Sequence, residues 1–387
     1  MKTRRVLVTG RGISGLFAAL RLQEAGYKVS LLGPASGAGA ASYAAVGMSS
    51  VKGLLLARDE VFRQKLRGHR RMPALIRELE AKSGRTIPHH FHGVIECFRS
   101  PEHYAALRER IFHGEFSGCF NLKVLGPDEL SKRSRLVSAG CSEGLRVSGA
   151  LLYPEDGWFH PEAFLKAVEA AFVRAGGAVV NGTLSSVSQG RTSEPSLAVG
   201  YQGEDCRQTS PEGATLHTDE LVLATGHRLG AMIRDYFEDT DLELTTLPGL
   251  TISAPADQIS GLDRDGFETV RFGRYGRNLS PEEIRFGSVD FPKGSSPDPG
   301  QKNQKISELA QKIKQELVVS LPDPEAITGL YGIRTLAKNR KPFLKQLRLK
   351  HSPSRAWVLG GMYKNGFDFA PELAETLVRL LQEKESR

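Results

Sequence analysis

The sequence has few cysteines and no long apolar run, and both absences narrow its class. The four cysteines, Cys97, Cys119, Cys141 and Cys206, are scattered and show no C-x-x-C spacing. This pattern is typical of reduced thiols in a cytoplasmic protein and argues against a disulfide framework or a cysteine metal site. No apolar run reaches the length of a transmembrane helix. Glycines stand where a signal peptide would carry its apolar stretch, so we expect a cytoplasmic chain without a membrane span.

The sequence also lacks the marks of a nucleic-acid-binding or metal-binding protein. Its net charge of +8 is compatible with anionic small ligands as well as with nucleic acid or a membrane surface. The densest basic stretch, Arg63–Arg71, has no interleaved aromatic residue, which predicts a solvated helix face. His89, His90 and His92 have no acid or cysteine nearby to complete a ligand set. We therefore expect neither a nucleic acid nor a metal ion as a ligand.

The N-terminal residues show the pattern of a strand, a glycine-rich turn and a helix. Residues 6–8 suit a buried parallel strand, residues 14–25 have the period of a helix, and residues 29–32 begin a second strand. Glycine lets the chain approach a pyrophosphate closely, and the helix N-terminus offers N–H groups to it. The unit predicts a dinucleotide site, and a tight structural turn is the alternative. The glycines have G-x-G-x-x-G spacing: Gly10, Gly12 and Gly15.

One acid is missing from this pattern. The second strand of such a unit usually ends in Asp or Glu, which accepts hydrogen bonds from the adenosine ribose. Here that position is Gly33, and the next acid along the chain is Asp59. We therefore expect the ribose to be held in another way, or weakly.

The rest of the chain reads as alternating helices and strands. Residues 36–53 are nearly all small, which favours a loop that covers a cofactor, with a tight turn at Gly47, over a flexible linker. Periodicity predicts helices at 54–82, 103–113, 161–175, 306–319 and 371–385. Strands are predicted at 92–99, 122–125, 145–152, 178–180, 221–226, 327–336 and 356–359, a meander at 181–218, loops at 291–305 and 360–369, and a separate antiparallel sheet at 244–290.

Six blocks in this order resemble the D-amino-acid-oxidase-like FAD-dependent oxidoreductases, in particular the branch with glycine oxidase and the related thiamine-pathway amine oxidase. They are the glycine fingerprint, ASYAAVGM (41–48), DGWFHPEAF (156–164), LVLATG (221–226), GLYGIRTLAKNRKPFL (329–344) and GGMYKNGFDFAPELAETL (360–377). The resemblance covers nearly the whole chain and implies an α/β fold. It divides the chain into a discontinuous Rossmann-type FAD-binding domain (1–90, 150–230 and 330–387) and an antiparallel-sheet α+β substrate or cap domain (91–149 and 231–329).

The resemblance also assigns residues to the cofactor, FAD. The family's pyrophosphate contacts fall on Gly10, Gly12, Ile13, Ser14 and Gly15, and the contacts to the flavin ring fall on Ser42, Ala44, Ala45, Gly47 and Met48. Val180 would face the adenine side, Thr225 and Gly226 would close the phosphate site, and Gly361, Lys364, Asn365, Gly366 and Phe367 would border the pyrimidine edge of the flavin. The N-terminus of the last helix would then stabilise negative charge on the reduced flavin.

For the substrate, the resemblance points to three residues. Arg334 would bind a carboxylate, because a planar guanidinium pairs with a carboxylate through two parallel bonds. A surface ion pair is the alternative for this arginine. Met48 would touch the substrate, and Tyr275 is the tyrosine nearest to the one that the family often supplies from its antiparallel sheet. His160 departs from the pattern, since it stands where the family usually has Asp.

Three hypotheses of function follow. The first is the FAD-dependent oxidation of a small-molecule amine or amino acid, in which hydride passes from the α-carbon to flavin N5 and the imine is hydrolysed. This chemistry needs positioning and exclusion of water more than a dedicated base. The second is a flavin monooxygenase, although the sequence has no second glycine fingerprint for a nicotinamide cofactor. The third is a flavin fold without catalysis, which Gly33 favours.

Overall fold

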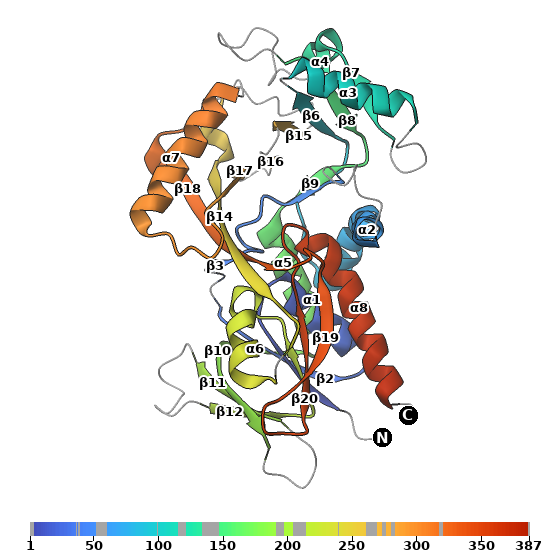
Figure 1. Cartoon of the computed structure of the whole chain (residues 1–387), viewed down its shortest axis with the longest axis vertical. Helices are drawn as coiled ribbons and strands as arrows, with labels where there is room; N and C mark the ends of the chain where they lie inside the picture. The colour runs from blue at the N-terminus through green and yellow to red at the C-terminus, as the bar shows by residue number, and fades with distance from the viewer. Residues whose placement is uncertain are drawn as a thin grey trace.

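The structure, a computed structural model, has two parts that the chain connects several times (Figure 1). The eight-stranded sheet and its helices form the lower part of Figure 1, and the smaller sheets with α3, α4 and α7 form the upper part. The structure describes residues 4–35, 37, 39–51, 60–98, 100–114, 121–133, 147–190, 197–203, 214–238, 240–260, 269–272, 276–279, 283–316 and 320–385.

The largest sheet has the strand order β12-β11-β10-β2-β1-β13-β20-β19. Its five central strands are parallel: β1 (Arg5–Thr9), β2 (Lys28–Gly33), β10 (Ala178–Gln189), β13 (Glu220–Leu223) and β20 (Arg355–Gly360). Three strands join antiparallel at the edges: β11 (Leu197–Gly203), β12 (Ala214–Thr218) and β19 (Phe343–Arg348). The parallel centre brings the carboxyl ends of β1, β2 and β13 to one edge, which is where ligands bind in open α/β sheets.

Helices cover both faces of this sheet, because side chains along each strand alternate between the faces. Val6 and Val8 of β1 are buried in a core on one face, whereas Leu7 is buried in a core on the other. The first core includes α1 (Ile13–Glu24), α2 (Glu60–Ser83), α5 (Pro161–Arg174) and α8 (Gly366–Glu385). The second includes α6 (Leu229–Tyr236), which follows the 3-10 helix η2 (Gly226–Arg228).

Three smaller sheets complete the fold. The five-stranded sheet β16-β17-β14-β18-β3 contains β3 (Gly39–Ala40), β14 (Leu244–Pro255), β16 (Gly276–Leu279), β17 (Glu283–Asp290) and β18 (Thr328–Ala337), and α7 (Pro299–Glu316) packs on it. The four-stranded sheet β15-β6-β8-β7 contains β6 (Val94–Phe98), β7 (Lys123–Leu125), β8 (Gly149–Tyr153) and β15 (Thr269–Phe272). The third contains β4 (Met48–Ser49), β5 (His89–His90) and β9 (Gly157–Phe159). The remaining helices are α3 (Pro101–Phe112), α4 (Pro127–Arg133), η3 (Ala256–Gln258) and η4 (Pro324–Ala326).

Most predicted elements are confirmed, including the N-terminal β1–α1–β2 unit and the meander of β10, β11 and β12. The strands predicted at 178–180 and 221–226 are confirmed and correspond to β10 and β13. β10 and β13 join the parallel sheet, whereas β9, the strand before α5, pairs with β4 and β5. β19 is an additional strand that the sequence analysis missed, because its FLKQLR sequence is mostly polar.

α7 and α8 begin more than a turn earlier than predicted. α7 begins at Pro299 and not at residue 306, because Asp298 and Gln301 cap it reciprocally. The Gln301 N–H donates to Asp298 Oδ1 (2.9 Å), and the Asp298 N–H donates to Gln301 Oε1 (3.0 Å). α8 begins at Gly366, so Pro371 lies inside the helix near its start, where its missing N–H removes one backbone bond.

The domain boundaries stay a prediction. The strands of the eight-stranded sheet fall in residues 5–33, 178–223 and 343–360. β18 crosses the predicted boundary at residue 330 and belongs to the five-stranded sheet. A separate hydrophobic core lies between the five-stranded and four-stranded sheets and includes Ile95, Leu250 and Leu309.

Candidate cofactor and substrate site

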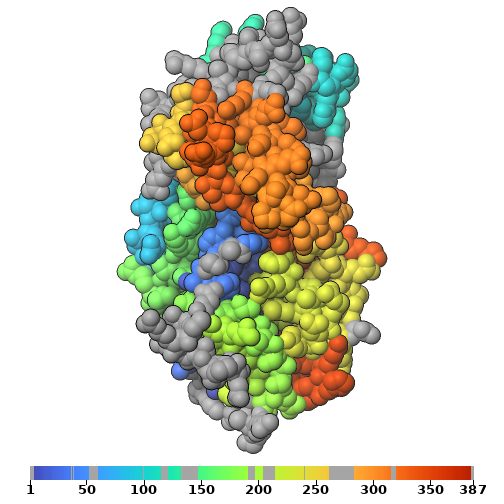
Figure 2. All heavy atoms as spheres, turned by 90° about the vertical axis from the view of Figure 1, so that its left-hand side faces the viewer, coloured from blue at the N-terminus to red at the C-terminus, as the bar shows by residue number. Residues whose placement is uncertain are grey.

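A cavity of about 1230 Å³ lies where the carboxyl ends of β1 and β13 face the five-stranded sheet. In Figure 2 the blue N-terminal residues are seen between the orange segment above them and the yellow-green segment beside them. The size exceeds that of most small-molecule pockets and suits a ligand as long as a dinucleotide. Segments that are far apart in the sequence line it, among them 9–14, 39–48, 224–228, 287–290, 332–335 and 359–368.

The glycines of the fingerprint serve different purposes. Gly10 has a φ of 103°, and a Cβ on it would lie 2.2 Å from the carbonyl oxygen of Ala224. A Cβ on Gly15 would lie 1.8 Å from the Gly10 oxygen, so these two glycines permit the close packing of β1, α1 and β13. Gly12 lines the cavity together with Ile13 and Ser14, and it leaves the backbone at the start of α1 accessible to a ligand.

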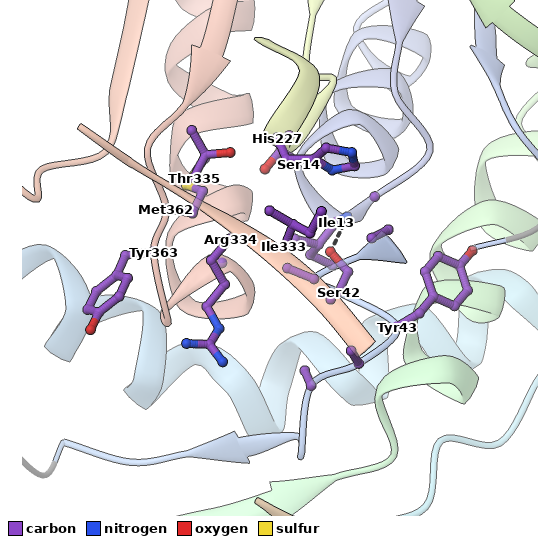
Figure 3. A pocket seen from close by; sticks show the side chains of 18 of the residues that line it. Ile13, Ser14, Ser42, Tyr43, His227, Ile333, Arg334, Thr335, Met362 and Tyr363 are labelled. Carbon is purple, nitrogen blue, oxygen red and sulfur yellow. Dashed lines mark hydrogen bonds between the residues drawn. The ribbon is translucent and has the colours of Figure 1, made fainter. Parts of the chain in front are cut away.

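The loop of small residues is fixed by polar contacts at both of its sides. Ser42 Oγ accepts a hydrogen bond from the Ile13 N–H (3.1 Å), so Ser42 caps α1 where Gly12 has no side chain to do so (Figure 3). Arg285 of β17, which is buried, donates to the carbonyl oxygens of Tyr43 (2.9 Å) and Ala45 (3.2 Å). These bonds hold residues 39–48 against the cavity.

The position of the missing acid has no room for a side chain. A Cβ on Gly33 would lie 2.6 Å from the Cβ of Arg11 and 2.9 Å from its backbone nitrogen. The Arg11 guanidinium makes two bonds to Glu169 of α5 (2.5 and 2.7 Å) and a third to Asn181 Oδ1 (2.8 Å). An acid is therefore supplied beside Arg11 by α5, and not by the end of β2.

Arg334 and Lys364 share one carboxylate at the cavity wall. Arg334 Nη1 donates to Asp290 Oδ1 (2.6 Å), and Lys364 Nζ donates to Asp290 Oδ2 (2.9 Å). Burial alone would raise the pKa of Asp290, but the attraction and hydrogen bonds of the two cations lower it, so the carboxylate stays ionised. Two cations and one anion leave one net positive charge, which suits a further anionic group. A Cβ on Gly249 would lie 1.9 Å from Arg334 Nη2, so this glycine makes room for the guanidinium.

Arg334 shows features of both predicted roles, a residue that binds a carboxylate and a member of an ion pair. Arg334 is in an ion pair, but its side chain is only 12% exposed and projects from β18 into the cavity (Figure 3). The ion pair thus lies within a binding site and not on the outer surface.

Tyr363 lies beside this cluster in an unusual backbone conformation. Its φ is 51°, which costs free energy for a residue with a side chain and often marks a functional site. Its N–H donates to the carbonyl oxygen of Thr335 (3.2 Å). The cations of Lys364 and Arg340 lie 5.4 and 5.9 Å from its ring centre, so two positive charges lie near the phenol ring.

The N-terminus of α8 also faces the cavity. The N–H groups of Asp368 and Phe369 bond to the carbonyl oxygen of Asn365 (3.2 and 3.1 Å), which starts the helix. Phe367 packs on Phe159 and Phe164, with ring centres 4.9 and 5.4 Å apart. The aromatic contacts fix this helix end relative to α5.

Most of the predicted site residues meet at this cavity. Gly15 and Val180 are exceptions, since Gly15 packs against Gly10 and Val180 against the core with α6. Tyr275 lies outside the described residues. The predicted residues that line the cavity are Gly10, Gly12, Ile13, Ser14, Ser42, Ala44, Ala45, Gly47, Met48, Thr225, Gly226, Arg334, Gly361, Lys364, Asn365, Gly366 and Phe367.

The cavity residues that were missed from the sequence include Arg11, His227, Asp290 and Tyr363. Arg11 lies inside the glycine fingerprint, and Tyr363 lies inside a block that carries the family resemblance, so position alone was a usable signal for both. Asp290 ends a predicted strand, but nothing in its local sequence indicates that it meets Arg334. Burial and the charge of Arg228 lower the pKa of His227, so this imidazole is neutral at pH 7.

The described residues also bear on metal binding and membrane insertion. Within the described part of the chain, no group of three or more His, Cys, Asp or Glu side chains is placed to hold a metal ion. Among the described helices, none is long and apolar enough to cross a membrane.

Comparisons with known proteins bear on the family and the fold. A family model described as "FAD dependent oxidoreductase" (DAO) matches residues 5–380. The solved structure of glycine oxidase from Geobacillus kaustophilus has a TM-score of 0.74 at 20% identity and covers 98% of this chain and 95% of that chain. The solved structure of iminodiacetate oxidase from Chelativorans sp. BNC1 has a TM-score of 0.74 at 15% identity. The match covers 98% of this chain and 95% of that chain.

The solved structure of L-α-glycerophosphate oxidase from Mycoplasma pneumoniae, with FAD bound, has a TM-score of 0.73 at 16% identity. The match covers 99% of this chain and 95% of that chain. A search of the curated proteins found no match. At these identities the structural likeness shows the fold, and it confirms the predicted α/β architecture with a Rossmann-type domain.

Proposed function

Because this chain belongs to the DAO family of FAD-dependent oxidoreductases, we propose that it oxidises an amine or amino acid that carries a carboxylate. The observation that carries the proposal is the cluster of Arg334, Asp290 and Lys364, which has one net positive charge and lines the same cavity as the glycine fingerprint. The fold shared with a glycine oxidase and an iminodiacetate oxidase supports this substrate class.

The residues present fit FAD. The N-termini of α1 and α8 both face the cavity, and α1 has no acidic residue in its first turn to repel a pyrophosphate. Gly10, Gly12, Ile13 and Ser14 would hold the pyrophosphate. Residues 41–48, Gly361 and residues 365–367 would hold the flavin ring, and Arg334 lines the same cavity. When bound, FAD supplies the acceptor for the hydride of the substrate.

The substrate side of the proposal rests on charge and position. Arg334 and Lys364 would bind the substrate carboxylate, and Asp290 keeps both cations in place before the substrate arrives. Binding a charged group to a prearranged pair avoids the entropy cost of ordering two long side chains. The carboxylate then fixes the direction in which the α-carbon points, which is the positioning that this chemistry needs.

The proposal is tested by anaerobic bleaching of the flavin with glycine, sarcosine, iminodiacetate and D-alanine. We expect at least one of them to bleach it. Arg334→Ala should raise KM for that substrate about 10- to 100-fold, since a hydrogen bond to a charged group contributes about 1.5–3 kcal/mol. Arg348→Ala is the matched control. Arg348 lies on the edge strand β19 and forms an ion pair with Glu238. Bleaching by L-α-glycerophosphate alone, or by NADPH alone, would contradict the proposal.

A further inference from the structure

Four buried polar side chains form a continuous chain next to the cavity. We call Asp368, Ser49, His69 and Asp156 the buried polar chain. Their exposed fractions are 5%, 1%, 2% and 1%. They come from α8, β4, α2 and the turn before β9, which meet near the middle of the molecule (Figure 1).

Hydrogen bonds connect the four groups without a gap. Ser49 Oγ lies 3.1 Å from Asp368 Oδ1 and 2.8 Å from His69 Nδ1. His69 Nε2 lies 3.2 Å from Asp156 Oδ1. The Val51 N–H also donates to Asp156 Oδ2 (3.3 Å), which holds this carboxylate towards the imidazole.

These distances are compatible with two arrangements of the protons. In the first, Ser49 donates to Asp368 and accepts from His69 Nδ1. In the second, Asp368 donates to Ser49, which donates to His69 Nδ1, while Nε2 donates to Asp156 in both. The change from the second to the first moves one proton from Asp368 to His69 in two short steps, without displacement of any heavy atom.

The two ends of the buried polar chain lie at two different cavities. Asp368 lines the main cavity. His69 and Asp156 line a second cavity of about 10 Å³, together with Asn121 and Glu155. A cavity of this size is about large enough for one water molecule. Asn121 is exposed and the Glu155 side chain is 52% exposed, so the second cavity lies at the surface.

The charges around the chain favour a proton at its inner end. Burial raises the pKa of the Asp368 carboxyl most strongly, and the charge of Asp156 raises it further. Lys65 and His69 of α2 and the Ser49 hydroxyl of β4 act in the opposite direction. Lys65 is only 6% exposed and also lines the main cavity.

We propose that the buried polar chain carries the proton lost by the substrate's ammonium group from the main cavity to the surface. An N–H bond of the substrate breaks, its electron pair stays on nitrogen, and an O–H bond forms on Asp368. Asp368 then gives a proton to Ser49 while Ser49 gives one to His69 Nδ1, and the proton on His69 Nε2 leaves for Asp156 and the water-sized cavity. One proton enters the buried polar chain and one leaves it, and a change of tautomer at His69 restores the Nε2–H form. No electrons are transferred in this step. The proposal rests on the proposed function, because oxidation needs the neutral amine.

The test measures proton release during anaerobic flavin reduction by glycine, sarcosine and iminodiacetate, with an indicator dye in weak buffer. Two variants interrupt the chain. His69→Gln can bond to Asp156 but cannot pass a proton on, and Ser49→Ala removes the middle link. We expect both to slow proton release about tenfold or more and to alter the pH profile of flavin reduction. Ser49→Thr, which restores the hydroxyl, should recover most of the rate.

His160→Asn is the matched control. His160 is also buried and lies 2.8 Å from a carboxylate oxygen of Glu283, but it caps α5 and is not part of the buried polar chain. Asn is a good helix cap, so this variant should release protons at the wild-type rate. Melting curves identify misfolded variants, and Asp156→Asn, which conserves shape, then replaces the variant that failed. Proton release at the wild-type rate in the folded variants overturns the proposal.

A second arm separates this proposal from the proposed function. If no amine bleaches the wild-type flavin, the proposed function fails. The buried polar chain is then tested with reduced methyl viologen in the presence of acetate. Two viologen radicals supply two electrons, and the flavin takes one proton from solution. Slower proton uptake in His69→Gln than in His160→Asn supports the buried polar chain as a proton path, and equal uptake overturns it.

Discussion

At the scale of single residues, Gly33 shows how a neighbour can exclude a side chain from a position. The acid expected at the end of β2 is missing because the backbone of Arg11 occupies the space, and Arg11 in turn binds Glu169. The end of the cavity next to Gly33 is therefore built around an arginine–glutamate pair.

We predict that Gly33→Ala destabilises the protein by about 1–3 kcal/mol, because the added Cβ would lie 2.9 Å from a backbone atom that has to shift. Gly126→Ala is the matched control, since nothing lies within 4 Å of a Cβ at that position. The control should be neutral or slightly stabilising. Urea unfolding of both variants measures the difference, and equal midpoints would show that Arg11 does not constrain residue 33.

Glu283 gives a prediction for pH. It pairs with Arg285 and His160 and accepts a hydrogen bond from Ser253, and these partners outweigh burial and lower its pKa to about 2. A folded-state pKa below the ordinary value of 4.5 means that the stabilisation is complete above about pH 4.5 and is lost as the pH falls towards 2.

Glu283→Gln should therefore cost about 2–3 kcal/mol at pH 7, where it leaves the Arg285 cation without its carboxylate, and much less at pH 3. Urea unfolding at pH 7, 5 and 3 measures this difference. Glu325→Gln, at an exposed position, should show no such trend. A cost that is the same at every pH would rule out the lowered pKa of Glu283.

At the scale of elements, helix starts were the least predictable feature. The reciprocal bonds of Asp298 and Gln301 begin α7 seven residues before the apolar period does. The Asp-x-x-Gln pattern was a readable signal, but apolar periodicity detects only the buried stripe.

Asp298→Ala should lower stability by about 1 kcal/mol, which is the usual effect of removing a side-chain cap. Asp323→Ala is its control, because Asp323 also precedes a helical turn but makes no side-chain cap bond. Thermal melting monitored by circular dichroism compares the two. Equal losses would mean that the capping bonds of Asp298 do not stabilise α7.

The basic stretch on α2 also belongs to this scale. Arg67 pairs with Glu372 (2.7 Å) and Arg71 with Glu375 (2.7 Å), both on α8. Their side chains are 50% and 48% exposed, as predicted for a solvated face, whereas Lys65 and His69 of the same stretch are buried, so the prediction was wrong for these two residues. The sequence could not show that the opposing acids lie three hundred residues away.

At the scale of the whole molecule, the cavity joins the eight-stranded sheet to the five-stranded sheet, so its ligand should stabilise both. We predict that FAD at about 100 times its Kd adds about 2.7 kcal/mol to the free energy of unfolding and raises Tm by about 2 °C or more.

Thermal melts of the apoprotein over a series of FAD concentrations measure this effect. Riboflavin, which lacks the pyrophosphate and adenosine, is the control and should raise Tm less, because it does not reach the N-terminus of α1. Equal shifts with both ligands would mean that the glycine fingerprint contributes nothing to binding.

The sequence by itself determined the β1–α1–β2 unit, the small-residue loop and the order of most elements, because periodicity, glycine spacing and turn residues act over short stretches of chain. Only the tertiary structure decided that Asp290 sits between Arg334 and Lys364, that Glu169 binds Arg11, and that Ser49, His69, Asp156 and Asp368 meet. These partners come from separate strands and helices, and the packing of sheets and helices, not any local pattern, brings them together.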